Sequence, residues 1–416
     1  MNITKHALKK GIDLYFIRDE KFKTYMASVL FHRPLNREGA SKGALLAQVL
    51  RCGNELHPSA KEIDVALEEL YGASLYCSSG KRGEEQVIRV AMEAVCDAFL
   101  PAPAFDKAME LLFAAAFKGN NRGSVEQEKK NLIDRIRGQI NDKRYYASLR
   151  LNEIMFDGRP YGINSIGYEE DVEKITPDDL FGFYDEVINT SAMSIIFTGN
   201  FDEAAAMAAA KKAVEALPER EAGHTLAEIT GGAGEVRRVT EHLDVTQGKL
   251  AMGLYTGIAH NDPLIYAQMV MNGLYGGSVN SKLFNNVRER LSLCYYASSR
   301  ADRMMGVMTV SSGIEFQNFD AAYNEIMAQL QAMKDGDFSD EEIDVIKKEI
   351  CNSFRSRVDA VEALEDYYTT QILLGSDVSI EETIENIENV TREQIKEAAG
   401  RVALDTVYFL AGKEEA

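Results

Sequence analysis

The histidines and cysteines, the residues best able to hold a metal ion, are few and poorly spaced for that role. No two histidines lie three or four residues apart, so none shares a helix face with another as a zinc-binding pair would. The cysteines are odd in number, widely separated and without a C-x-x-C pair, which argues against a disulfide framework and against a cysteine zinc site. The histidines are His6, His32, His57, His224, His242 and His260, and the cysteines are Cys52, Cys77, Cys96, Cys294 and Cys351.

Other binding signals are also missing from the 416 residues. No G-x-x-x-x-G-K-[ST] phosphate loop occurs. The 46 Lys+Arg against 65 Asp+Glu give a net charge of −19, which repels nucleic-acid phosphates, so we expect no nucleic-acid partner. No apolar run is long enough to span a bilayer, and residues 1–6 lack the apolar stretch of a signal peptide. We therefore expect a cytoplasmic globular protein without a membrane partner.

The elements that would position a site are arranged as a duplication. Three landmarks recur in the same order at nearly one offset, given by 319 − 105 = 214, 339 − 124 = 215 and 391 − 176 = 215. Three ordered matches at half the chain length indicate two homologous halves. The landmarks are 105–108 with 319–322, 124–127 with 339–342, and 175–179 with 390–394.

Each half is predicted to be an α+β lobe. Thr176 and Thr391 each lie three residues before a side chain that can complete a capping box, and so mark helix starts. Strands are predicted at 25–31, 87–92, 249–255 and 307–310, and paired helices at 105–117, 125–141, 319–334 and 340–356. The predicted fold is two homologous lobes, each a mostly antiparallel mixed sheet covered by helices on one face. The N-terminal lobe spans 1–215, a Gly-containing linker 216–235 and the C-terminal lobe 236–416.

Residues 281–296 carry a resemblance to a known family. They read S-K-L-F-N-N-V-R-E-R-L-S-L-C-Y-Y, similar to the S-x-L-F-x-x-x-R-E-x-x-G-L-x-Y signature in the second half of the pitrilysin/insulinase peptidases. Arg288 and Tyr295 fall on the Arg and Tyr of that signature, and Ser292 stands where the signature has Gly. The resemblance covers the whole chain, because lobe size, duplication and linker position fit the two-lobe bacterial members. It implies the metallopeptidase fold of the LuxS and mitochondrial-processing-peptidase type.

The same resemblance implies a degenerate zinc site in the first lobe. The family's H-x-x-E-H signature corresponds to the helical segment 42–54, where its three positions hold Ala44, Ala47 and Gln48. The family's third metal ligand, a Glu on a later helix, corresponds to Arg135. Ala can neither coordinate zinc nor move a proton, and a guanidinium repels a cation. We expect no metal in this chain.

The resemblance further implies a role beside a second subunit. In heterodimeric family members, one chain supplies H-x-x-E-H and the other supplies the Arg/Tyr pair, which stabilises the negative charge that grows on a peptide carbonyl under attack. Arg288 and Tyr295 would act in this way at the zinc site of an H-x-x-E-H partner, and the partner would hold the zinc. An extended peptide would add to a sheet edge, and Gly276 and Gly277 are candidates for contacting its backbone.

Other interpretations stay open at this point. Through residues 70–76, the chain most resembles the metal-free subunit of the bacterial pair associated with 5-aminopentanol modification of elongation factor P. The main alternative is a structural or peptide-binding protein without a part in hydrolysis, like the core subunits of respiratory complexes that share this fold. A peptidase with an unfamiliar metal site is a third. In the plainest interpretation, Arg288 is a helix-end cation, Tyr295 a core aromatic and Gly276–Gly277 a helix-ending turn.

Overall fold

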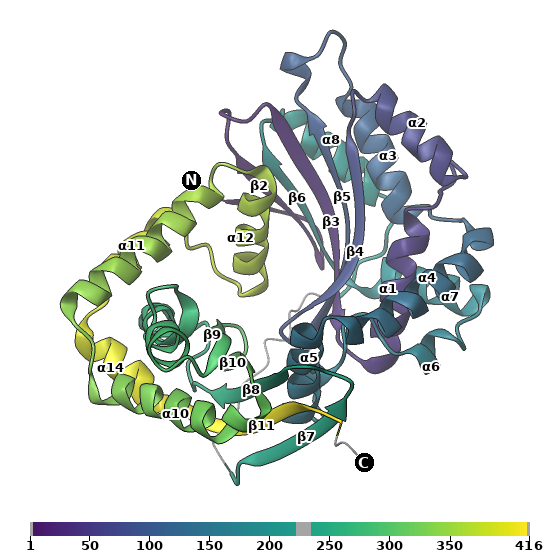
Figure 1. The fold of residues 1–416 in the computed structure, drawn as a ribbon. Helices are drawn as coiled ribbons and strands as arrows, with labels where there is room; N and C mark the ends of the chain where they lie inside the picture. Colours follow the sequence, from purple (N-terminus) through teal and green to yellow (C-terminus); the bar gives the residue numbers. More distant parts are fainter. Residues whose placement is uncertain (1–2, 222–233, 414–416) are drawn as a thin grey trace. The chain divides into compact units, whose positions relative to one another are not determined.

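The computed structural model describes residues 3–221 and 234–413, which form two compact units (Figure 1). The first comprises Met1–Arg137, Ile163–Leu226 and Arg357–Ser379, and the second Gly138–Gly162, Ala227–Ser356 and Ile380–Ala416. Each unit therefore contains one segment from the other half of the sequence. The lobe boundaries 1–215 and 236–416 follow the repeat along the chain and stay a prediction. Of the predicted linker 216–235, residues 222–233 lie outside the described part.

The first unit is built on a six-stranded sheet in the order β1-β2-β6-β3-β5-β4. Strands β2 and β6 are parallel, and the other neighbours are antiparallel. The strands are β1 (Thr4–Lys9), β2 (Ile12–Arg18), β3 (Thr24–Pro34), β4 (Ser74–Arg82), β5 (Glu85–Val95) and β6 (Ala192–Gly199).

Helices cover the two faces of this sheet very unequally. Side chains alternate between faces along a strand, so Tyr25, Val29 and Phe31 of β3 enter the main core, whereas Ser28 faces the other way. The main core lies under α1 (Arg37–Leu50), α2 (Ala60–Glu69), α3 (Phe105–Phe117), α4 (Val125–Gly138), α7 (Pro177–Thr190) and α8 (Glu203–Val214). The opposite face meets α12 (Val361–Leu373), which contacts β3 and β6 and comes from the C-terminal half of the sequence (Figure 1).

The second unit repeats this plan on a five-stranded sheet in the order β7-β11-β8-β10-β9. Strands β7 and β11 are parallel and the others antiparallel. The strands are β7 (Arg237–Leu243), β8 (Gly248–Tyr255), β9 (Cys294–Asp302), β10 (Val307–Ile314) and β11 (Ala403–Gly412), and the helices are α9 (Ile265–Asn272), α10 (Phe319–Asp335), α11 (Asp340–Arg357), α13 (Ile380–Glu388) and α14 (Arg392–Arg401).

One helix from the N-terminal half, α5 (Lys143–Met155), packs against β8 and β11 of this second sheet. The approach is close at Gly253 of β8, where a Cβ atom would lie 2.4 Å from the sulfur of Met155. Gly253 therefore allows α5 to rest directly on the strand.

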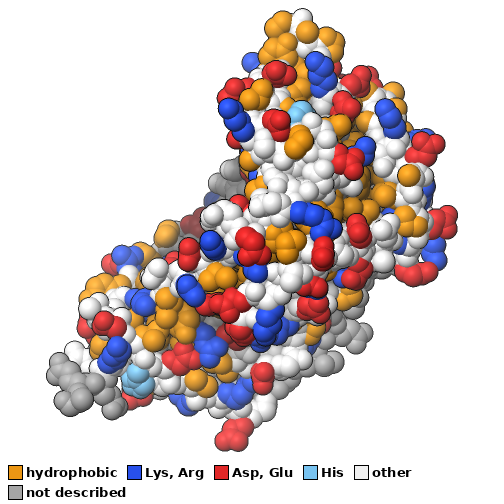
Figure 2. Space-filling model, turned by 90° about the vertical axis from the view of Figure 1, so that its right-hand side faces the viewer, with side chains coloured by type: hydrophobic (Ala, Val, Ile, Leu, Met, Phe, Trp, Pro, Cys, Tyr) orange, Lys and Arg blue, Asp and Glu red, His pale blue; other side chains and the backbone are white. Residues whose placement is uncertain are grey.

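The predicted fold class is confirmed, and so are the predicted helix starts. Capping boxes join Thr176 to Asp179 and Thr391 to Gln394 at the N-termini of α7 and α14. Helix α3 has the predicted bounds. Within residues 3–221 and 234–413, no helix has both the length and the apolar composition needed to cross a bilayer. Acidic and basic side chains are interspersed over the face shown in Figure 2.

Candidate functional site

Arg288 and Tyr295 lie on consecutive elements of the second unit, η6 (Leu283–Arg290) and β9. Segment η6 is π-helical, and the backbone N–H of Leu291 accordingly donates to the carbonyl of Asn286, five residues back, at 3.2 Å. Buried Leu283 and Val287 hold the segment against the unit's interior. The side chain of Asn286 donates to Gln329 of α10 at 2.8 Å, so η6 is fixed by packing and by a hydrogen bond.

The turn between the two elements needs a left-handed residue. Ser292 has φ = +51°, in the region that favours glycine, and the N–H of Leu293 then bonds to the carbonyl of Val287 at 3.0 Å. The family signature has Gly at this position, so the conformation supplies a physical reason for that Gly. The turn forms here with Ser, at the cost of backbone strain.

The Arg288 guanidinium reaches the surface. Its side chain is 41% exposed, and its Cζ atom lies 4.7 Å from the centre of the Phe284 ring, one turn earlier. This contact orients the guanidinium by a cation–π interaction. Glu289 approaches it only to 3.6 Å, a weak surface ion pair. Arg288 can therefore donate to a ligand.

Tyr295 is also exposed, by 61%, on the edge strand β9. Its hydroxyl donates to Oε1 of Glu315 at 2.7 Å, and this hydrogen bond to a carboxylate raises the pKa of the Tyr295 phenol. A raised pKa keeps the phenol protonated, and hence a hydrogen-bond donor, to a higher pH. The interpretation of Tyr295 as a core aromatic does not hold, since most of the side chain meets solvent.

Gly276 and Gly277 belong to another π-helical segment, η5 (Gly273–Gly277). Gly276 is buried against β9, where a Cβ atom would lie 2.7 Å from the backbone nitrogen of Ser299, so close packing accounts for this glycine. Gly277 is exposed. Ser278, the next residue, donates to Glu349 of α11 at 2.5 Å, which fixes the end of the segment. Peptide contact by the two glycines stays a prediction.

The residues at the degenerate zinc positions do not fit a metal. Ala44 and Ala47 of α1 are 5% and 4% exposed, and Gln48 is half-buried. Arg135 is exposed on α4. Methyl groups have no lone pair to donate, and within the described ranges 3–221 and 234–413 no three His, Cys, Asp or Glu side chains are grouped to hold an ion.

Two further groups of polar residues in the first unit were not singled out from the sequence. Cys52 and Glu128 come within 3.7 Å beside the end of α1, but two side chains fall short of the three protein ligands of a catalytic zinc site. His32 lies 3.1 Å from Ser194 and 3.9 Å from Glu85, in the order of a hydrolase triad. The longer distance exceeds a hydrogen bond, and all three residues are buried, so we interpret this row as internal structure.

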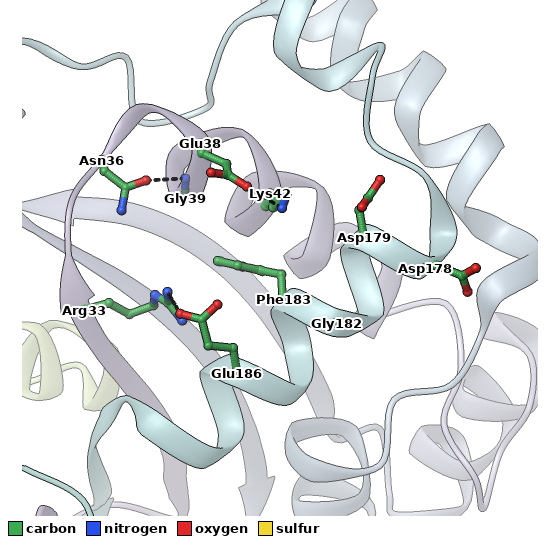
Figure 3. Close-up of a pocket in the computed structure, with 10 residues that line it drawn as sticks. All are labelled: Arg33, Asn36, Glu38, Gly39, Lys42, Asp178, Asp179, Gly182, Phe183 and Glu186. Carbon is green, nitrogen blue, oxygen red and sulfur yellow. Dashed lines mark hydrogen bonds and ion pairs between the residues drawn. The ribbon is translucent and has the colours of Figure 1, made fainter.

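A pocket of about 390 Å³ opens beside the N-terminus of α1 (Figure 3). Phe183 and Gly182 of α7 line one side, with Arg33 and Lys42 among the charged residues around them. The charges are paired within the protein: Arg33 with Glu186, Lys42 with Glu38, and Asp178 with Arg122, while Asp179 caps α7. The pocket therefore presents a neutralised surface and does not resemble a catalytic centre.

Known proteins place the chain in a family. It is 36% identical to the probable inactive metalloprotease YmfF of Bacillus subtilis (strain 168), over 98% of this chain and 97% of that protein. The chain belongs to the M16 peptidase family. The family model for the peptidase M16 inactive domain matches residues 174–350 of this M16 chain. The resemblance to pitrilysin/insulinase peptidases predicted from residues 281–296 is thereby confirmed.

Solved structures share the fold of this M16 chain. A conserved protein from Enterococcus faecalis V583 is 29% identical and superposes with a TM-score of 0.93 over 100% of both chains. The peptidase M16 inactive domain from Pseudomonas fluorescens is 17% identical, with a TM-score of 0.81 over 100% of this chain and 99% of that one. At 17% identity the likeness supports the fold alone.

Proposed function

We propose that this chain is the zinc-free subunit of a two-chain M16 peptidase. It would act in the cytoplasm, bind an extended peptide, and present Arg288 and Tyr295 to the zinc site of a partner with an intact H-x-x-E-H. The observation that carries the proposal is a contrast in exposure. The Arg288 side chain and Tyr295 are 41% and 61% exposed, whereas Ala44 and Ala47, at the metal-binding positions, are 5% and 4% exposed.

The proposed contribution is electrostatic. When water adds to a peptide carbonyl, negative charge grows on the carbonyl oxygen, and an N–H or O–H donor aimed at that oxygen stabilises the transition state. One such donor is typically worth about 10² to 10³ in rate. Arg288 carries a positive charge, and Tyr295, whose pKa is raised by the hydrogen bond to Glu315, is a protonated donor at neutral pH, as an ordinary phenol is. The partner's zinc would supply Lewis acidity that this chain lacks.

The edge strand β9 offers a place for the peptide. It pairs with β10 on one side, and among the described residues no strand pairs with its other side. An extended peptide could therefore bond to its free N–H and C=O groups by strand addition, next to Tyr295. Side chains on the two faces of the sheet beside β9 would then contact the side chains of the peptide and select its sequence.

Reconstitution with an H-x-x-E-H partner tests the proposal. Tyr295→Phe should lower the peptide hydrolysis rate of the pair by about 10² to 10³, because a donor to the oxyanion is lost. Tyr145→Phe is the control, since Tyr145 is also an exposed tyrosine, at 46%, and its hydroxyl accepts from Gln139 on the neighbouring turn. Equal rates for Tyr295→Phe and the unsubstituted protein would contradict the proposed role.

One observation favours the alternative of a peptide-binding protein without a part in hydrolysis. The hydroxyl of Tyr295 is already engaged by Glu315 at 2.7 Å and would have to leave that carboxylate to serve an oxyanion. Under this alternative, Tyr295→Phe would leave any hydrolysis unchanged, and peptide affinity measured by fluorescence anisotropy on this chain alone would be retained. The link to 5-aminopentanol modification of elongation factor P stays a prediction.

A further inference from the structure

The two halves of the chain exchange one helix in each direction. Helix α12 leaves the second unit, to which the preceding α11 and the following α13 belong, and packs on the sheet of the first (Figure 1). Helix α5 comes from the N-terminal half of the sequence and packs on the sheet of the second unit. Because the halves are homologous, each helix has a related sheet within its own half. Docking there would keep it close to its neighbours in sequence and cost less chain entropy. Specific contacts must therefore favour the sheet that belongs to the other half of the sequence.

The two helices can be compared position by position. Both have 13 residues, Lys143–Met155 and Val361–Leu373, so their starts and ends differ by the same amount, 361 − 143 = 373 − 155 = 218. The three buried positions of α5 are also buried in α12: Ala147, Leu151 and Met155 match Glu365, Thr369 and Leu373, and α12 buries further residues besides these. At one central buried position, α5 therefore has Ala147 where α12 has Glu365.

Among residues 3–221 and 234–413, the hydrogen-bond partners of Glu365 lie on the first sheet. Its Oε1 accepts from the hydroxyl of Ser28 on β3 at 2.6 Å and from the guanidinium of Arg89 on β5 at 2.6 Å. Ser28 and Arg89 lie on the sheet face opposite the main core, where α12 rests. The Glu365 side chain is 1% exposed, so its negative charge depends on these two donors.

The second sheet offers the opposite surroundings. Ala147 packs there with Leu151, Ala251, Tyr408 and Leu410, and a carboxylate in its place would be buried without a partner. The same surface also carries Glu241 on β7, which is satisfied by Arg150 of α5 at 2.7 Å and by the hydroxyl of Tyr408 at 2.8 Å. If α12 replaced α5, Arg150 would be gone, and Glu241 would lose its cationic partner and keep the hydroxyl of Tyr408.

We propose that buried Glu365, through Arg89 and Ser28, specifies the sheet on which α12 docks. On the second sheet the carboxylate would be buried without a donor, which makes that choice costly. Selectivity of this kind comes from penalising the wrong arrangement rather than from strengthening the right one. Replacing a buried ion pair by apolar residues is often neutral or stabilising, so its retention fits a role in selection better than one in stability.

The test separates selection from stability. In the full chain, Ser28→Ala, Arg89→Met and Glu365→Met are combined, and spin labels are placed through unnatural amino acids at exposed Lys23 and at exposed Glu362 of α12. After refolding, double electron–electron resonance should show one Lys23–Glu362 distance in the parent. In the triple variant it should show a second, comparable distance population, while the unfolding temperature stays equal or rises. A single native distance in the triple variant would overturn the proposal.

Two single substitutions complete the design. Glu365→Leu removes both the charge and the polar atoms of this side chain, so it decides the question if the triple variant does not fold: a second distance population supports the proposal, and a single one refutes it. Asp366→Asn is the matched control next in sequence. The Asp366 side chain is 45% exposed and pairs with Arg82 on the surface, so this variant should keep one distance. A second population in Asp366→Asn would show that any lost charge loosens α12, and would also overturn the proposal.

Discussion

Two regions that the family resemblance predicts as functional differ in the structure. One is the set of positions on α1 that correspond to H-x-x-E-H, and the other is the η6–β9 segment. On α1, the positions that correspond to the metal ligands hold Ala44, Ala47 and Gln48, and buried Leu45, Leu46 and Val49 dock the helix. At η6–β9, charge and hydroxyl remain at the surface on a turn that costs strain to form. The comparison teaches that apolar burial holds α1 in place, whereas the side chains of Arg288 and Tyr295 meet solvent beside Phe284 and Glu315.

The largest expected effect concerns the surface cation. Arg288→Ala should lower the hydrolysis rate of a reconstituted heterodimer by about 10² to 10³, because a charged donor to the oxyanion is removed. Arg290→Ala, which removes an exposed arginine from the same segment, is the control and should leave the rate near that of the unsubstituted pair. If Arg288→Ala and Arg290→Ala lower the rate equally, the effect comes from general surface charge. The contrast between α1 and η6–β9 then gives no evidence for a specific role of Arg288.

The second effect concerns the metal itself. The purified chain should contain no stoichiometric zinc, because Ala44 and Ala47 supply no ligand and Gln48 alone cannot hold the ion. Inductively coupled plasma mass spectrometry measures this directly, on protein that is incubated with zinc and then dialysed against zinc-free buffer. One tightly bound zinc per chain that survives dialysis would break the comparison at its first half.

The third effect concerns the strained turn. Ser292→Gly should stabilise the protein by up to about 1 kcal/mol, since the left-handed conformation costs a non-glycine residue about 1 to 2 kcal/mol and the added freedom of the unfolded chain takes part of this back. Urea unfolding measures the change. Ser353→Gly, at an exposed position inside α11, should instead destabilise by roughly 0.5 to 1 kcal/mol. Destabilisation by Ser292→Gly would show that Ser292 is not strained.

The smallest effect concerns the phenol. Glu315→Gln removes the carboxylate that raises the pKa of Tyr295, so that pKa should move down toward its ordinary value. The phenol of the unsubstituted protein accordingly holds its proton to higher pH than the phenol of the variant. Ultraviolet difference titration against Tyr295→Phe isolates this one tyrosine. An unchanged pKa would mean that Tyr295 is free of Glu315 in solution.

Local sequence signals were enough for much of the fold. The capping boxes at Thr176 and Thr391, the bounds of α3 and the strands at the centres of both sheets follow from residue spacing over a few positions. Capping and periodicity depend on neighbours in the chain, so sequence alone reveals them. The positions of Arg288 and Tyr295 also came from a local pattern, while their exposure did not.

Other features depend on contacts between residues that are distant in the chain. The exchange of α5 and α12 rests on contacts such as Glu365 with Arg89, and no pattern in residues 361–373 states which sheet will receive that helix. Gly276 is required by its close packing against β9, and the hydroxyl of Tyr295 donates to Glu315, twenty residues later in the chain.

The residue types by themselves predict that positions 44 and 47 supply no zinc ligand, because no fold gives an alanine side chain a lone pair. They also predict the duplication, from three matches at nearly one offset. Only the tertiary structure decided that Arg288 and Tyr295 face solvent and that each half lends a helix to the other. Both features depend on tertiary packing. The free energy of that packing comes from contacts between residues that are far apart in the sequence, so no local sequence pattern predicts it.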